Sequence, residues 1–363
     1  MSKKVMVGMS GGVDSSVCAK LLQDKGYECV GVTLRMYNNE TIDKANAKTC
    51  CSDEDVADAR SVAYKLGMQF YAFNFIDDFR EKVICKFVND YKNGLTPNPC
   101  IECNRYMKFS KMYDRALALG YDYIATGHYA KNEFNEQTGR WELKKAKDLS
   151  KDQSYVLYCL TQEQLAHTLF PLGDYTKPEI RQIAEQSGFV NAKKSDSQDI
   201  CFVPDGDYAG FIERFGGETS ETGNYLDKNG KILGRHKGII HYTIGQRKGL
   251  GIALGKHAFV ISKNAEDNTV VLGDNDDLFC KYVTVNDINW VSVSEIKEPI
   301  EACVKLRYRH TEQPARLIPN DDGSVTVEFD EPQRAPSAGQ SAVFYNGDTV
   351  LGGGTIVKGS NEI

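Results

Sequence analysis

The sequence has no apolar run near the roughly 18 residues that a membrane-spanning helix requires, so we expect no membrane association. It also has no basic excess: the formal net charge of −6 argues against a generally basic nucleic-acid binder, although it leaves room for a local basic face. The first apolar run starts almost at the N-terminus and leaves no space for a signal peptide, so we expect a cytoplasmic protein. The eleven cysteines are then expected to be thiols for catalysis or metal binding, not a disulfide scaffold.

Two familiar nucleotide-binding motifs are missing as well. No Gly-Lys-Ser/Thr follows the first glycine turn, which excludes a Walker loop, and Gly-x-Gly-x-x-Gly is absent. Instead, a short apolar run leads into residues 10–16 (SGGVDSS), and a helix-like stretch follows. Adjacent glycines let a ligand approach the backbone closely, and the free N–H groups at a helix start attract phosphate. The pattern predicts an anion site, where Asp14 could hold Mg²⁺, a ribose or a phosphate-bound water.

Strand-like and helix-like stretches alternate up to about Gly188. Strands are expected at residues 5–8, 28–34, 69–75 and 123–126, and helices at 13–25, 52–66, 79–93 and 110–119. Such alternation predicts an α/β fold with a doubly wound parallel sheet covered on both faces. Ligands of this architecture bind at the carboxyl ends of the strands, where residues 10–16 would lie.

The pattern changes after about Asp205. Glycine becomes dense, a hairpin-like stretch follows at residues 259–273, and a two-residue period sets in from about Leu278. An Asn346-Gly347 turn joins two apolar runs near the end, as in a β-hairpin. We therefore expect a catalytic domain at 1–204, a small central α+β or β domain at 205–277 and a C-terminal β-barrel at 278–363.

Residues 96–105 form the second informative stretch, with Cys100 and Cys103 in Cys-x-x-Cys spacing. Two prolines argue against a regular helix or central strand, so we expect these cysteines on a stiff loop. The spacing serves redox, metal and cluster sites. A zinc site would need a second pair, and the nearest candidate is the single Cys201.

Further motifs follow the glycine loop in one order along nearly the whole chain. They are 98–104 (NPCIECN), 125–129 (ATGHY), 151–155 (KDQSY), 199–202 (DICF), 245–251 (GQRKGLG), 307–309 (RYR) and 339–343 (GQSAV). Together with the Ser-Gly-Gly-x-Asp-Ser loop of ATP pyrophosphatases, they resemble the tRNA-specific 2-thiouridylases. Those enzymes place sulfur on C2 of the wobble uridine, U34, of tRNA.

The resemblance implies a mechanism and its residues. ATP adenylates the C2 oxygen, pyrophosphate leaves, and a sulfur nucleophile then displaces AMP. Cys103 would be the nucleophile, favoured as thiolate by a nearby cation such as Arg105 or Lys108. Cys201 would carry a persulfide from a cysteine desulfurase or sulfur-relay protein, and the two cysteines could close a transient disulfide.

The resemblance also implies two sets of binding residues. The ATP site, with Mg²⁺, would comprise Gly8, Met9, Ser10, Gly11, Gly12, Val13, Asp14, Ser15, Leu34 and Gly127. The tRNA anticodon loop would contact Asn98, Pro99, Cys100, His128, Lys151, Asp152, Gln153, Tyr308, Arg309 and Gln340.

Basic and apolar residues alternate near the end of the chain. Lys305, Arg307 and Arg309 are expected on one face of a strand, with Leu306 and Tyr308 on the other. Such a basic stripe suits tRNA phosphates, and its alternative is simply a solvated face.

Cys100 departs from the family pattern, in which many members have an aspartate at this position. The change creates three cysteines, Cys100, Cys103 and Cys201, that could hold a [4Fe–4S] cluster with one iron left open. Sulfur would then travel on that iron and not as a persulfide. Two alternative functions remain: an amide-forming ATP pyrophosphatase, and a non-catalytic tRNA-binding protein that uses ATP as a switch.

Overall fold

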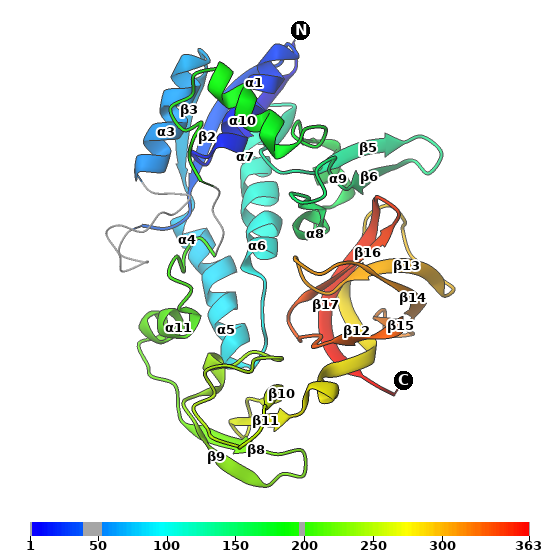
Figure 1. Ribbon diagram of the computed structural model, residues 1–363. Helices are drawn as coiled ribbons and strands as arrows, with labels where there is room; N and C mark the ends of the chain where they lie inside the picture. The colour runs from blue at the N-terminus through cyan, green and yellow to red at the C-terminus, as the bar shows by residue number, and fades with distance from the viewer. Residues whose placement is uncertain (1, 39–52, 196–199, 363) are drawn as a thin grey trace.

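A parallel sheet forms the first part of the molecule. The computed structural model describes residues 2–38, 53–195 and 200–362 (Figure 1). The sheet has five strands in the order β3-β2-β1-β4-β7, and all neighbours pair in parallel. Its strands are β1 (Lys4–Gly8), β2 (Glu28–Arg35), β3 (Gln69–Asn74), β4 (Tyr123–Thr126) and β7 (Thr168–Leu169).

Helices cover both faces of this sheet. Val5 and Val7 belong to one core, with residues of α1 (Val13–Asp24), α3 (Asp53–Lys65) and α10 (Lys177–Gln186). Met6, which points to the other face, belongs to a second core. That core includes residues of α4 (Ile76–Phe79), η1 (Arg80–Cys85), α5 (Lys86–Lys92) and α7 (Met112–Ala118). The expected doubly wound α/β fold is confirmed.

The expected stiff loop at Cys100 and Cys103 is wrong, because both cysteines are helical. Helix α6 (Pro99–Glu102) runs directly into the π-helical η2 (Cys103–Lys111). Asn98 caps the start of α6, and its side chain accepts a hydrogen bond from the Cys100 backbone N–H at 3.2 Å. Pro99 occupies the first turn, where a missing N–H costs no helical hydrogen bond. The proline thus starts a helix instead of preventing one.

Smaller elements follow β4. The hairpin of β5 (Lys131–Asn135) and β6 (Arg140–Lys144) was not expected, and one pairing, between Thr349 and Lys144, joins it to the C-terminal sheet. Short helices are α8 (Ser154–Leu157), α9 (Gln162–Ala166) and α11 (Tyr208–Gly216). No helix in the described ranges is long and apolar enough to cross a membrane.

The central region contains a four-stranded sheet in the order β10-β11-β8-β9, at the bottom of Figure 1. Its strands are β8 (Gly223–Leu226), β9 (Ile232–His236), β10 (Phe259–Asn264) and β11 (Thr269–Gly273). Strands β10 and β11 pair antiparallel, as expected for the hairpin at 259–273. Two 3₁₀ turns, η3 (Ile239–His241) and η4 (Asn275–Leu278), lie in the same region.

The last part is the expected β-barrel, at the right of Figure 1. Its strands are β12 (Phe279–Trp290), β13 (Ile300–Lys305), β14 (Gln313–Pro319), β15 (Val325–Arg334), β16 (Ser341–Asn346) and β17 (Thr349–Ser360). Pairing of β12 with both β15 and β17 closes the barrel around buried Val, Leu, Ile and Phe side chains. The barrel is docked on α8 by buried bonds, such as the one that the Tyr155 hydroxyl donates to Ser341 O at 2.8 Å.

The prediction of a basic strand through residues 305–309 is wrong, because only Lys305 belongs to a strand. Strand β13 ends at Lys305, and the chain then turns. The His310 N–H donates to Arg307 O at 3.0 Å, and His310 Nδ1 accepts from the Leu306 N–H at 3.3 Å. These local bonds replace strand pairing, so Arg307 and Arg309 lie on a turn at the edge of the barrel.

Candidate functional site

The glycine loop lies where β1 ends and α1 begins. Within it, the Ser15 hydroxyl accepts from the Ser10 N–H at 3.2 Å and donates to Gly12 O at 3.1 Å. Gly11 has a φ of +75°, and a Cβ there would overlap the backbone carbonyl of Asp55 on α3. Gly12 caps α1 without a side-chain hydrogen bond. The helix start therefore presents the backbone N–H donors and positive dipole end expected of an anion site.

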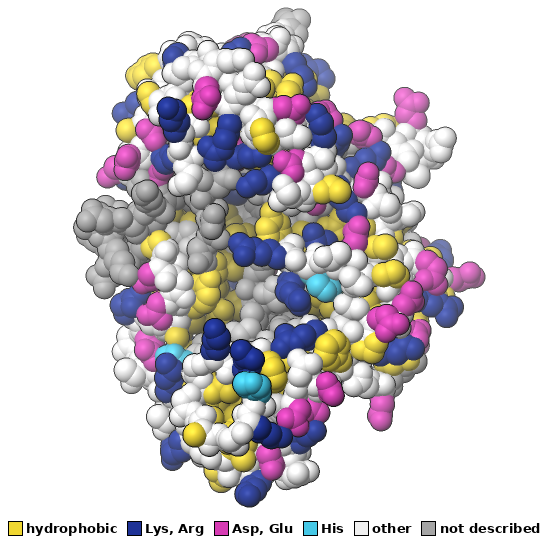
Figure 2. Space-filling model, viewed as in Figure 1, with side chains coloured by type: hydrophobic (Ala, Val, Ile, Leu, Met, Phe, Trp, Pro, Cys, Tyr) yellow, Lys and Arg dark blue, Asp and Glu magenta, His cyan; other side chains and the backbone are white. Residues whose placement is uncertain are grey.

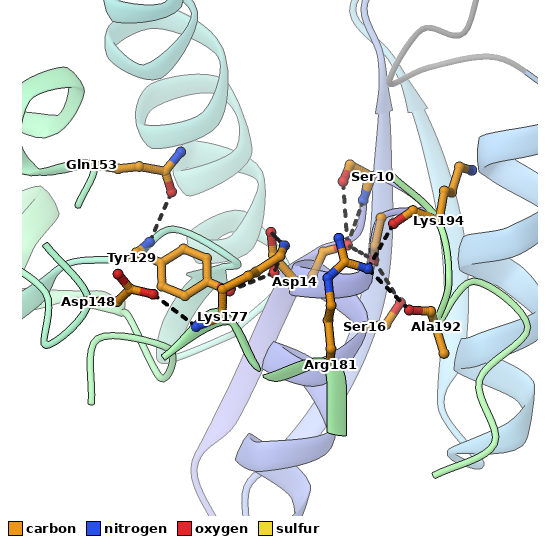
Figure 3. Close-up of polar contacts among 12 residues, drawn as sticks. Ser10, Asp14, Ser16, Tyr129, Asp148, Gln153, Lys177, Arg181, Ala192 and Lys194 are labelled. Atoms are coloured by element: carbon orange, nitrogen blue, oxygen red, sulfur yellow. Dashed lines mark hydrogen bonds and ion pairs between the residues drawn. The ribbon is translucent and has the colours of Figure 1, made fainter. Parts of the chain in front are cut away.

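Asp14, in the first turn of α1, is tied to two other elements (Figure 3). Its carboxylate accepts from Lys177 Nζ at 2.7 and 2.8 Å, and Lys177 is the first residue of α10. The Tyr129 hydroxyl donates to Asp14 Oδ1 at 2.8 Å. A carboxylate has about four lone-pair positions, so Asp14 retains capacity to accept from a further ligand.

The carboxyl ends of β1, β2 and β4 meet at this loop. Thr33 of β2 donates its hydroxyl hydrogen to Met9 O at 2.6 Å, and Leu34 beside it is buried. Gly127 follows β4, and a Cβ there would lie 2.7 Å from the backbone of both Asp14 and Ser15. The structure thus brings the predicted nucleotide-site residues to one edge of the sheet, as open α/β sheets do.

His128, a predicted tRNA contact, lies in the interior instead of on an open surface. Its Nδ1 is 2.7 Å from the Thr126 hydroxyl, and its Nε2 is 3.4 Å from Lys108 Nζ. Burial, and then the Lys108 charge, hold the pKa of His128 well below its ordinary value, so the ring is neutral. Lys108, a predicted partner of the Cys103 thiolate, is thus placed against a histidine.

The two predicted reactive cysteines occupy different elements. Cys103 begins η2, is half-buried, and has its Sγ 3.7 Å from Met36 Sδ. Cys201 is half-buried, and the next residue, Phe202, anchors it in an aromatic core. The Phe202 ring lies 5.3 Å from the Phe87 ring in an edge-to-face contact.

Cys100 is exposed, one turn before Cys103. Across residues 2–38, 53–195 and 200–362, no three Cys, His, Asp or Glu side chains are grouped so that they could hold a metal ion. Cys100, Cys103 and Cys201 therefore do not form such a group in this structure, and we derive no step through a cluster.

A buried thiol near this site was not anticipated. Cys159 Sγ lies 3.7 Å from the carbonyl oxygen of Ile101 on α6. Burial raises the pKa of Cys159 to about 12, and Arg105 only partly opposes this effect. Arg105 also acts on the half-buried Glu102, where burial raises the pKa of the carboxyl and the Arg105 charge only partly opposes this. The Cys159 thiol therefore stays protonated at neutral pH and is a poor nucleophile.

Two of the predicted tRNA contacts at 151–153 have internal partners. Asp152 is buried, and its Oδ2 accepts from the Ser154 hydroxyl at 2.7 Å while its Oδ1 accepts from the Ala146 N–H at 3.0 Å. Gln153 Oε1 accepts from the Tyr129 N–H at 3.0 Å. These bonds shape the turn that carries Lys151 and connect it to Tyr129 at the glycine loop.

The barrel is hydrogen-bonded to the segment just before α6. Gln340 Nε2 donates to Thr96 O at 2.7 Å, and the Thr96 N–H donates to Ala338 O at 2.8 Å. The Tyr308 ring centroid lies 6.0 Å from that of Tyr155. Burial raises the pKa of Tyr308, and the Asp152 carboxylate adds to this effect. The barrel turn therefore packs against α8.

Figure 2 shows Lys and Arg side chains around the hollow between the three parts of the molecule. Positive charge at a concave junction suits a polyanionic ligand, whatever the net charge of the chain. Two residues at the glycine loop, Lys177 and Tyr129, were not among the predicted site residues. Tyr129 ends the 125–129 motif, whereas Lys177 follows Thr176, which forms a capping box with Glu179 at the start of α10.

Three family models match the chain in succession. They are the tRNA methyl transferase HUP domain at residues 3–205, the tRNA methyl transferase PRC-barrel domain at 209–274 and the aminomethyltransferase beta-barrel domain at 280–356.

Full-length relatives are similar over the whole chain. The tRNA-specific 2-thiouridylase MnmA of Clostridioides difficile is 50% identical over 358 residues, covering 99% of each chain. The protein of the same name from Acetivibrio thermocellus is 51% identical over 355 residues, covering 98% of this chain and 99% of the relative. Two of the domain models are named after methyl transferases, whereas the full-length relatives are named after thiolation. The relatives are the more specific match, because they are about 50% identical over all three parts of the chain.

Proposed function

The chain belongs to the family of tRNA-specific 2-thiouridylases, and on that premise we propose how it converts the wobble uridine, U34, of tRNA to 2-thiouridine. The glycine loop binds the phosphates of ATP, and the C2 oxygen of U34 attacks the α-phosphorus. Pyrophosphate leaves, and the C2 oxygen is now part of an AMP leaving group. The observation that supports this assignment is the packing of Gly127 on the backbone of Asp14 and Ser15, which brings the end of β4 against the glycine loop that follows β1.

ATP and Mg²⁺ are the cofactors we propose. Mg²⁺ supplies charge neutralisation for the phosphates when it is bound, and it prefers one or two carboxylates together with phosphate oxygens. Asp14 fits this preference as the carboxylate of the loop, with acceptor capacity beyond its bonds to Lys177 and Tyr129.

The sulfur step uses Cys201 and Cys103. A cysteine desulfurase or relay protein places a persulfide on Cys201, and its terminal sulfur attacks C2 and displaces AMP. The Cys103 thiolate then attacks Cys201 Sγ, which breaks the S–S bond and leaves the sulfur on C2. The two thiols become a disulfide while the transferred sulfur is reduced, and a cellular thiol reductant resets the pair. The half-buried positions of both cysteines, held by η2 and by the Phe202 anchor, support these roles.

The substrate step is tested with purified protein, ATP, a persulfide donor and two tRNA transcripts that differ only by U34 or C34. We expect 2-thiouridine and pyrophosphate with U34 and neither with C34. Pyrophosphate release that is independent of tRNA would instead favour an amide-forming ATP pyrophosphatase. Tight tRNA binding with no pyrophosphate from either transcript would favour a non-catalytic ATP switch.

Cys100→Ala distinguishes the persulfide route from the cluster route. Because Cys100 is exposed and lies outside any metal-holding group of the described residues, we expect this variant to retain substantial thiolation with a persulfide donor. The decisive measurement is anaerobic reconstitution of both proteins with iron and sulfide, followed by absorbance and thiolation assays. Visible absorbance and activity that vanish together in Cys100→Ala would show the cluster route.

Replacing both Arg307 and Arg309 with alanine should weaken tRNA binding and flatten its salt dependence. Both lie on the barrel turn beside Tyr308, and loss of two phosphate contacts lowers the slope of log affinity against log salt by about 1–2. Arg316→Ala, an exposed arginine on β14, is the matched control. An unchanged salt slope in the double variant would remove the turn from the tRNA interface.

A further inference from the structure

Lys177 reaches the glycine loop from a helix far along the chain. A capping box fixes the start of α10: the Thr176 N–H donates to Glu179 Oε2 at 2.6 Å. The Lys177 N–H donates to Asp148 Oδ2 at 3.0 Å. The first residue of α10 is therefore held from two sides, and its side chain extends to Asp14 (Figure 3).

The contact of Lys177 with Asp14 is close and largely shielded from solvent. Lys177 is only 7% exposed, and its ammonium lies 2.7 and 2.8 Å from the two Asp14 oxygens. The shielded Lys177 ammonium requires an opposite charge nearby, and the half-buried Asp14 carboxylate supplies it, so each group holds the other in place. The Tyr129 hydroxyl, bonded to the same carboxylate, limits its rotation further.

The segment after α10 is also hydrogen-bonded to the glycine loop and the first turn of α1. Asn191 is buried, and its Nδ2 donates to both Gly11 O and the Ser16 hydroxyl at 2.9 Å. Arg181 of α10 donates to Lys194 O at 3.2 Å, which ties this segment back to the helix. Helix α10 and residues 189–194 thus form one wall against the glycine loop, and Lys177 is the member of that wall that reaches Asp14.

The Asp14 carboxylate can have two opposite effects at this loop: it can bind Mg²⁺, and it can repel the phosphates of ATP. A carboxylate that could rotate freely at a helix start would compete with phosphate for the same N–H donors and would repel the triphosphate. We propose that Lys177 is a positioning residue for adenylation: it holds the Asp14 carboxylate off the N–H groups at the helix start, which stay open to phosphate, while the carboxylate keeps acceptor capacity for Mg²⁺. This inference rests on the adenylation step proposed above and adds a residue that acts through Asp14.

Lys177→Met and Lys177→Arg test the proposal by tRNA-dependent pyrophosphate release. We expect Lys177→Met to lower kcat about 100-fold, as for a misplaced reacting group, and to raise the KM for ATP about tenfold. Lys177→Arg keeps the positive charge, so its kcat and its KM for ATP should stay close to the wild-type values. A purely structural loss would lower the amount of active enzyme and leave KM unchanged. Lys20→Met, which removes a partly exposed lysine of α1 that pairs with Asp24, should behave as the wild type.

A double-mutant cycle on the dissociation constant of ATP with Mg²⁺ tests whether Lys177 acts through Asp14. Asp14→Asn with Lys177→Met leaves no unpaired buried charge, so it should fold, and it should bind ATP no more weakly than Asp14→Asn alone. If the losses of ATP affinity in the two single variants add up in the double variant, the proposal is wrong and Lys177 contacts the nucleotide directly. Wild-type KM and kcat in Lys177→Met would overturn it too. A wild-type protein that releases no pyrophosphate with U34 tRNA would instead refute the proposed function.

Discussion

Replacing Cys103 with serine should abolish 2-thiouridine formation while tRNA-dependent pyrophosphate release continues. Cys103 begins η2, whereas the proposed adenylation residues lie on the glycine loop and after β4, so the two steps depend on separate groups. A serine hydroxyl cannot open the Cys201 persulfide, because it supplies no thiolate at neutral pH. The measurement is pyrophosphate release and nucleoside mass spectrometry on the same reaction with a persulfide donor.

Cys85→Ser is the matched control, because Cys85 is another half-buried thiol on a π-helical segment. It should thiolate as the wild type does. Binding of tRNA should stay within a few-fold in both variants, since phosphate contacts supply most of the affinity. Wild-type thiolation by Cys103→Ser would contradict the proposed nucleophile, and equal loss in Cys85→Ser would show a general effect on folding.

Gly127→Ala should lower pyrophosphate release about 100-fold, because a shift of the reacting groups by about an ångström has that effect. The new methyl group would lie 2.7 Å from the backbone of Asp14 and Ser15, so the glycine loop and the end of β4 must separate. The change adds no charge and removes no hydrogen bond. Its effect should therefore be local.

Gly216→Ala provides the control for this substitution. Gly216 ends α11, and a Cβ there would meet only the flexible end of Lys92. This variant should keep wild-type activity and gain slightly in stability, since alanine favours a helix over glycine by about 1 kcal/mol. Full activity in Gly127→Ala would show that β4 and the glycine loop need not be in contact for adenylation.

Local patterns predicted the parallel sheet and the glycine loop. Strand β1, the turn at Gly11 and Gly12 and helix α1 follow one another within a few residues, so their periodicity and turn residues contain the needed information. The rule that ligands bind at the carboxyl ends of parallel strands then located the site. The barrel could be predicted for the same reason, from two-residue alternation and the Asn346-Gly347 turn.

The failures came where one residue type permits two structures. Pro99 was taken to prevent a helix, yet at a first helical turn it starts one. Alternation through residues 305–309 resembled a strand, but hydrogen bonds to His310 form a turn there. The contact between Lys177 and Asp14 spans 163 positions, and no local pattern records such a distance.

Transfer of the oxygen of U34 to AMP tests the central claim most directly. A tRNA carrying ¹⁸O at C2 of U34 is incubated with the protein, ATP and a persulfide donor, and the products are analysed by mass spectrometry. If the C2 oxygen attacks the α-phosphorus at the glycine loop, each AMP formed with 2-thiouridine carries one ¹⁸O and pyrophosphate carries none. Labelled water or labelled pyrophosphate, with unlabelled AMP, would contradict adenylation of the uridine and with it the proposed role of residues 10–16.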